Sequence, residues 1–86
     1  MKKITINVTF NKWGHGNINV VPSNYKQWDP VQSSSQDYNL DSGEYTILFD
    51  TVTGGGGSIV VTHNENIIAQ GNLDTGLYSG HLRITI

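Results

Sequence analysis

The chain has 86 residues, a formal net charge of −2 and no cysteine. This length predicts one domain over residues 1–86, because single domains have about 50 to 200 residues. Without cysteine there can be neither a disulfide framework nor a thiolate nucleophile. Five basic side chains are too few to track a phosphate backbone, so we expect no nucleic-acid partner. No apolar run approaches the roughly 18–20 residues that cross a bilayer, and we expect no membrane span.

The composition favours strands over helices. The chain has nine isoleucines, seven valines and eight threonines, but only one alanine, Ala69. β-Branched side chains lose rotamer freedom in helices and pack well on pleated sheets. Nine asparagines and ten glycines supply turn residues. We therefore expect an all-β protein.

The first strand is predicted over about residues 2–11. Apolar residues alternate there with polar ones: Ile4, Ile6, Val8 and Phe10. Successive side chains of a strand point to opposite faces, so this pattern buries one face. The segment 13–17 contains two glycines that can take positive φ, which predicts a hairpin loop before a second strand. Pro22 ends that strand, since proline cannot donate to a central ladder.

Residues 24–36 form the least regular segment, and we expect a long loop with one short strand around Val31. A strand near residues 36–40 leads into a turn, and the next strand begins at Tyr45. Residues 40–46 read LDSGEYT. This Leu-x-x-Gly-x-Tyr-Thr stretch resembles a corner found in immunoglobulin-like and jelly-roll modules. The resemblance implies that Gly43 takes the tight bend and that the Tyr45 hydroxyl bonds back to loop backbone.

The remaining chain alternates short strands with turns. Glycines 54–57 predict a flexible connection, and turns are expected at residues 63–66 and 73–76. The last strand again alternates apolar and polar residues, with Leu82, Ile84 and Ile86 on one face. Turn signals thus recur about every 8–15 residues, as in sandwiches and small barrels. We expect a single antiparallel β-sandwich of seven or eight strands, either jelly-roll-like or immunoglobulin-like.

The sequence contains no motif for catalysis. There is no Gly-x-Ser-x-Gly elbow, and the three histidines have no evident carboxylate partner. We expect no enzyme, no catalytic residue and no cofactor. Calcium is the one metal for which the spacing of oxygen ligands is suggestive, at Asp37, Asn39, Asp41 and Glu44. The alternative is that these residues are ordinary turn formers.

The aromatic residues divide into two sets. Phe10, Tyr38, Tyr45 and Phe49 occupy in-facing strand positions and are predicted core. Trp13, Tyr25, Trp28 and Tyr78 lie in predicted loops among polar residues. Flat aromatic faces beside amides and carboxylates suit a sugar ring. The predicted ligand-binding residues are Trp13, His15, Asn24, Tyr25, Trp28 and Asp29. The alternative is that these loop aromatics plug the ends of the sandwich.

The function expected from this pattern is a non-catalytic, lectin-like carbohydrate-binding module, with a glycan as partner. A first alternative is a structural module of a virion, fibre or cell-surface assembly that forms homo-oligomers through sheet edges. A second alternative is a membrane-active β-sandwich that uses the same aromatics as interfacial anchors. Each of these readings favours an extracellular or surface location over the cytoplasm.

Overall fold

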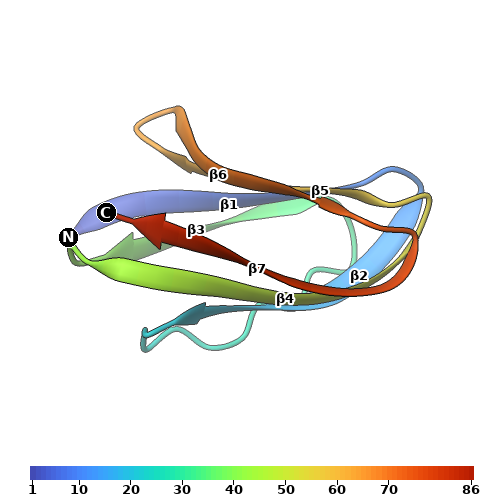
Figure 1. Ribbon diagram of the computed structural model, residues 1–86, viewed down its shortest axis with the longest axis horizontal. Coiled ribbons are helices and arrows are strands. Elements are labelled where there is room, and N and C mark those ends of the chain that lie inside the picture. Colours follow the sequence, from blue (N-terminus) through green and yellow to red (C-terminus); the bar gives the residue numbers. More distant parts are fainter.

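The computed structural model describes all 86 residues and contains seven antiparallel strands in two packed sheets, with no helix (Figure 1). The predicted β-sandwich is therefore confirmed. The strands are β1 (Lys2–Phe10), β2 (Trp13–Val21), β3 (Ser34–Leu40), β4 (Glu44–Gly54), β5 (Gly57–His63), β6 (Asn66–Leu73) and β7 (Gly76–Thr85).

The two sheets share the chain unevenly. Four strands form one sheet in the order β3-β1-β5-β6, and three form the other in the order β2-β4-β7. Only the β5–β6 connection stays within a sheet, and every other connection crosses between the two layers. The turns after β1, β4 and β6 gather at one end of the sandwich, and both termini lie at the opposite end (Figure 1).

The core lies between the sheets and takes residues from all seven strands. Its 14 buried apolar side chains are Ile4, Ile6, Val8, Phe10, Ile18, Val20, Tyr38, Leu40, Ile47, Phe49, Ile59, Val61, Leu73 and Ile84. They recur at every second position, as half-buried strands require. The four aromatics predicted as core all face inward: three are buried, and Tyr45 is partly buried against the cluster.

Two threonines extend the inner face of β4 beyond the apolar core. Thr51 and Thr53 are buried, and their hydroxyls donate to the carbonyl oxygens of Tyr78, at 3.4 Å, and Asp74, at 3.2 Å. Buried hydroxyls are tolerated when they are hydrogen-bonded in this way. The two bonds connect β4 to β7 and to the β6–β7 turn.

The predicted hairpin loop at residues 13–17 is wrong, because β2 already begins at Trp13. Neither Gly14 nor Gly16 has a positive φ. A Cβ atom at Gly14 would lie 2.4 Å from Cδ1 of Phe10, and one at Gly16 would lie 2.5 Å from the carbonyl oxygen of Asp50. These glycines therefore allow close packing instead of a turn.

The glycine run 54–57 is shorter as a connection than predicted. Gly54 belongs to β4 and Gly57 to β5, so only Gly55 and Gly56 turn, with φ of 92° and 70°. Asn11 holds this turn with two hydrogen bonds of 2.9 Å, from its backbone N–H to Gly56 and from its side-chain amide to Gly55. The connection is thus tied to the β1–β2 turn.

The corner before β4 has the predicted geometry. The Tyr45 hydroxyl donates to the carbonyl oxygen of Asp41 at 2.7 Å. Gly43 lies at the bend and exchanges two backbone hydrogen bonds with Ile86, at 2.8 and 2.9 Å. The resemblance to a β-sandwich corner is therefore confirmed at this site.

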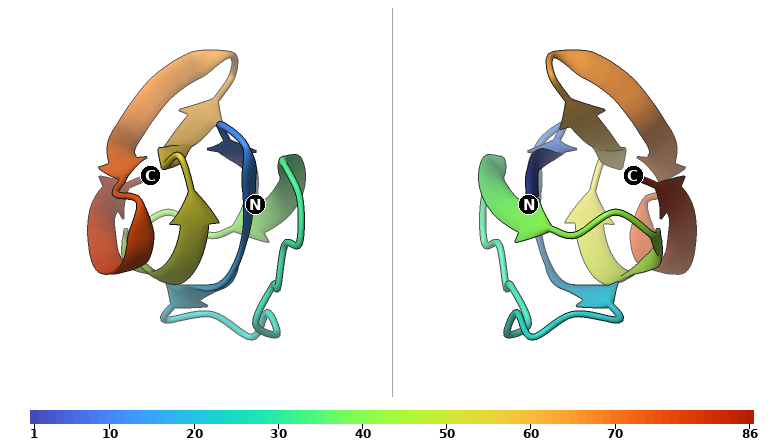
Figure 2. Two further views of the ribbon diagram at one scale, coloured as in Figure 1. Left: turned by 90° about the vertical axis from the view of Figure 1, so that its right-hand side faces the viewer. Right: turned by 90° about the vertical axis from the view of Figure 1, so that its left-hand side faces the viewer.

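The two long sides of the sandwich differ. Residues 22–33 connect β2 to β3 across one side (Figure 2). Within this segment Trp28, not the predicted Val31, pairs with β2, exchanging hydrogen bonds of 2.8 and 2.9 Å with Ile18. The Trp28 side chain packs against the core. On the other side, β6 and β7 are the outermost strands of their sheets, and no segment runs beyond them.

Candidate functional site

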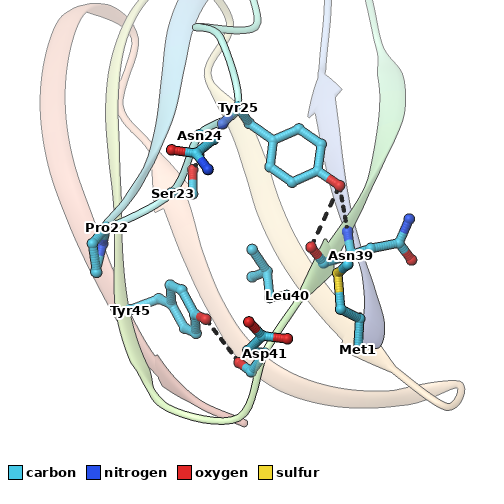
Figure 3. Close-up of a pocket in the computed structure, with 9 residues that line it drawn as sticks. All are labelled: Met1, Pro22, Ser23, Asn24, Tyr25, Asn39, Leu40, Asp41 and Tyr45. Carbon is cyan, nitrogen blue, oxygen red and sulfur yellow. Dashed lines mark hydrogen bonds between the residues drawn. The ribbon is translucent and has the colours of Figure 1, made fainter.

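An open hollow of about 660 Å³ lies at the end of the sandwich that carries the chain termini (Figures 1 and 3). The loop after β2 forms one wall, and the end of β3 with the corner before β4 forms the other. Its nine lining residues are Met1, Pro22, Ser23, Asn24, Tyr25, Asn39, Leu40, Asp41 and Tyr45.

The first wall is shaped by a short turn after β2. Pro22 ends the strand, and the Ser23 hydroxyl then donates to the carbonyl oxygen of Val20 at 2.6 Å. The same hydroxyl accepts the Tyr25 N–H at 3.3 Å. Serine side chains commonly hold turns through such backbone bonds. The turn fixes Asn24 and Tyr25 at the rim of the hollow (Figure 3).

The Tyr25 ring is held from two directions. Its hydroxyl accepts the Asn39 N–H at 2.8 Å, so the loop is joined to β3. The ring also meets the Tyr38 ring edge-to-face, with centroids 4.9 Å apart and planes at 75°. This geometry is a favourable one for aromatic pairs. Tyr25 nevertheless stays exposed on the hollow side.

Tyr45 and Asp41 form the facing wall. The bond from the Tyr45 hydroxyl to the Asp41 backbone fixes the tyrosine ring, while the Asp41 carboxylate points away from that bond (Figure 3). Every hydrogen bond drawn among the lining residues in Figure 3 joins a tyrosine hydroxyl to a backbone group. The side chains of Asn24, Asn39 and Asp41 take no part in them. The hollow thus combines two fixed rings with the Asn24 amide and the Asp41 carboxylate, whereas the Asn39 amide points away from the other lining side chains (Figure 3).

Behind the Tyr25 ring lies an unusual buried group. Tyr38 is fully buried, and its hydroxyl has no hydrogen-bond partner. Burial, with a smaller contribution from neighbouring Tyr25, raises the pKa of Tyr38 to about 12. The neutral phenol is favoured because the phenolate would lose its hydration. The unbonded hydroxyl of Tyr38 therefore belongs to a ring that packs directly against the Tyr25 ring of the hollow.

The structure separates the residues that the sequence placed in one site. Asn24 and Tyr25 line the hollow, whereas Trp13 and His15 lie on the solvent-facing side of β2. Trp28 packs against the core, as the alternative plug interpretation predicts. Asp29 is exposed beside β2 and accepts a hydrogen bond from Gln27 at 2.6 Å. Only two of the six predicted residues meet in the hollow.

Trp13 lies near the other end of the sandwich and remains 57% exposed. Its indole covers Gly54, where a Cβ atom would fall 2.1 Å from Nε1 and 2.5 Å from Cε2. A second open hollow of about 430 Å³ lies beside it, lined by Phe10, Lys12, Trp13, Gly14, Val31, Gln32 and Ser33.

Asn39, Asp41 and Tyr45 line the hollow but were absent from the predicted ligand-binding set. Asn39 and Asp41 had been singled out as calcium ligands, and Tyr45 as core. The alternation of Asn39 with Tyr38 and Leu40 is the signal that its side chain leaves the core. No three histidine, aspartate or glutamate side chains group closely enough to hold a metal ion.

Comparison with protein-family models, curated proteins and solved structures finds no match to this chain. No helix of the structure has the length and apolarity needed to cross a bilayer. The hollow is therefore interpreted from its own residues.

Proposed function

We propose that the chain is a non-catalytic carbohydrate-binding domain and that the hollow beside Tyr25 and Tyr45 is its site. The observation that carries this proposal is the pairing of two fixed tyrosine rings with the free side chains of Asn24 and Asp41. Sugars present apolar C–H faces and a fringe of hydroxyls. Aromatic rings pack on the former, while amides and carboxylates hydrogen-bond the latter.

The size and preorganisation of the hollow support this proposal. Its volume of about 660 Å³ falls in the range of about 300–1,000 Å³ typical of small-molecule sites. Both tyrosine hydroxyls are already bonded to backbone, so little side-chain freedom remains to be lost when a ligand binds. Asp41 supplies the acceptor that can make charge-assisted bonds to sugar hydroxyls.

The experiment is a ¹H–¹⁵N NMR titration of the whole chain with a panel of neutral oligosaccharides. We expect saturable shifts of the backbone amides of Asn24, Tyr25, Asn39 and Asp41. We expect Asp41→Asn to weaken binding about 10- to 100-fold, because a hydrogen bond to a charged group is lost. Asp74→Asn is the matched control, since Asp74 lies in the β6–β7 turn at the other end. It should leave the affinity unchanged.

Three results would contradict the proposal. One is the absence of any saturable shift across the panel. Another is a titration that moves the Trp13 indole N–H while the amides of the hollow stay still, which would place the site at the other end of the sandwich. Equal losses in Asp41→Asn and Asp74→Asn would also remove the assignment to the hollow.

A further inference from the structure

The four outermost strand edges of the sandwich are not equally protected. Unpaired edges attract other strands, and proteins usually cover, cap or distort them. Residues 28–30 cover the edge of β2 through the bonds of Trp28 to Ile18 and of Pro30 to Gly16. The Tyr25 hydroxyl caps β3 by accepting the N–H of Asn39. The edge of β2 is therefore covered, and the edge of β3 is bonded at Asn39, near the end of that strand.

The two edges on the open side differ from each other. In β6 the register shifts opposite Val61 and Thr62, which leaves Ile68 as an extra residue in that strand. Such a bulge distorts an edge and hinders further pairing. β7 pairs with β4 without interruption over ten residues and contains neither proline nor lysine. β7 is therefore the longest outermost strand that pairs without interruption, and no further strand is bonded to its edge.

We propose that β7 pairs with β7 of a second copy of this chain, antiparallel about a two-fold axis at Gly80. The two three-stranded sheets then join into one six-stranded sheet. A second copy fits this edge because the pairing is self-complementary, as the side chains on the outer face show.

The register at Gly80 gives compatible neighbours on the solvent-facing side. It places Ser79 opposite His81 of the second copy and Leu77 opposite Arg83. Shifting the axis to His81 would put the two identical histidines side by side. Shifting it to Leu82 would put His81 against Arg83. The axis at Gly80 places neither two histidines nor His81 and Arg83 directly opposite each other, and we therefore place the axis there.

The inner side of β7 supports the same pairing. Tyr78 and Leu82 pack against the core yet stay only partly buried, although Leu82 approaches Gly71 of β6. In the proposed register Tyr78 of one copy lies opposite Leu82 of the other. Pairing therefore covers apolar surface that the single chain leaves in water.

A charge test uses Leu77, which is 88% exposed and so free of the packing that holds the single chain together. Leu77→Lys places a lysine opposite Arg83 twice in each dimer, and Leu77→Glu places a glutamate there. Both variants remove the same leucine. From the energies of cross-strand pairs, we expect their dimer dissociation constants to differ about 30-fold, with Leu77→Glu the tighter. Sedimentation velocity over a concentration series measures both.

A second experiment tests the register, using the absence of native cysteine. Residues directly opposite in a sheet have Cα atoms about 4.5–5.5 Å apart, within reach of a disulfide. We expect mixed Ser79→Cys and His81→Cys proteins to form a covalent heterodimer under mild oxidation, and neither variant to cross-link alone. Self-cross-linking of His81→Cys would overturn the register at Gly80. A strict monomer for both the natural chain and Leu77→Glu would overturn the pairing itself.

Discussion

The two long sides of this sandwich differ in how the chain covers the outermost strand edges. On the side of β2 and β3, residues 22–33 close the gap between the sheets and insert Trp28 against the core. They cover the edge of β2 and bond Asn39 near the end of β3. On the side of β6 and β7, no segment of the chain covers either edge, and Leu82 and Ile68 are only partly buried. The closing segment also supplies Asn24 and Tyr25 to the hollow.

One irregular connection, residues 22–33, therefore both covers a strand edge and supplies part of the hollow. The hydrogen bond that caps the Asn39 N–H on the edge of β3 also fixes the Tyr25 ring at the hollow. Stabilising the fold and shaping the hollow are therefore coupled on the closed side. On the open side, no connection both covers a strand edge and lines the hollow.

The largest expected effect separates the two sides directly. We expect Trp28→Ala to lower the free energy of unfolding by about 3 kcal/mol, because a large ring that seals the core is lost together with its packing. Leu82→Ala on the open side should cost about 1–2 kcal/mol, since Leu82 is partly exposed from the start. Urea denaturation followed by circular dichroism measures both variants. Tryptophan fluorescence gives a second measurement for Leu82→Ala. Equal losses of unfolding free energy in the two variants would show that Trp28 stabilises the fold no more than Leu82 does.

A second prediction concerns the orphaned hydroxyl behind the hollow. We expect Tyr38→Phe to raise the free energy of unfolding by about 1 kcal/mol, because it removes a buried polar group without a partner. Thermal unfolding of the variant and the natural chain at neutral pH checks this. A loss of stability in Tyr38→Phe would mean that the hydroxyl has a partner in solution.

The same residue predicts a pH dependence. The pKa of Tyr38 rises from 10.0 to about 12 on folding, so the unfolded chain releases this proton first. The contribution to stability is complete below about pH 10 and is lost as the pH rises toward 12. Tyr38→Phe should lack this part of the decline when unfolding is followed across that range. An identical decline in both proteins would contradict the assignment.

A third prediction tests the cap on β3. We expect Tyr25→Phe to cost about 1 kcal/mol, because the Asn39 N–H loses the hydroxyl that accepts it at 2.8 Å. Tyr78→Phe makes the same chemical change on the open side and should cost less. Chemical denaturation of the two variants side by side decides this. A larger loss in Tyr78→Phe would reverse the contrast between the sides.

The smallest expected effect lies on β6. Ile67 is 59% exposed, so Ile67→Thr should change the free energy of unfolding by less than about 0.5 kcal/mol. Threonine keeps the β-branched shape that strands favour. A loss of unfolding free energy as large as that of Leu82→Ala would show that the Ile67 side chain on the open side is covered in solution.

The sequence predicts the strands well where one face is buried. In β1 a slip of one residue would expose every apolar side chain, so the alternation from Ile4 to Phe10 determines both strand and register. It predicts the start of β2 poorly, because Gly14 and Gly16 look the same whether glycine serves a turn or a close approach. Only the neighbouring Phe10 ring and Asp50 backbone decide between the two.

The site was harder to predict than the fold. Trp13 and Asn24 are close in sequence, but β2 runs between them and separates the ends of that strand by about 26 Å at roughly 3.3 Å per residue. Asn39 and Asp41 come near Tyr25 only through the long β2–β3 connection. Such contacts depend on tertiary packing, which local patterns do not encode.

The most direct test of the contrast between the two sides is amide hydrogen exchange at two chain concentrations. We expect the amides of Gly16, Ile18 and Trp28 to exchange slowly at both, because they are bonded within one chain. Alternate amides of β7 should exchange fast in dilute solution and slowly when concentrated, as the second copy covers them. Fast exchange of the Ile18 and Trp28 amides would contradict the account. So would exchange at the β7 edge that does not change with chain concentration.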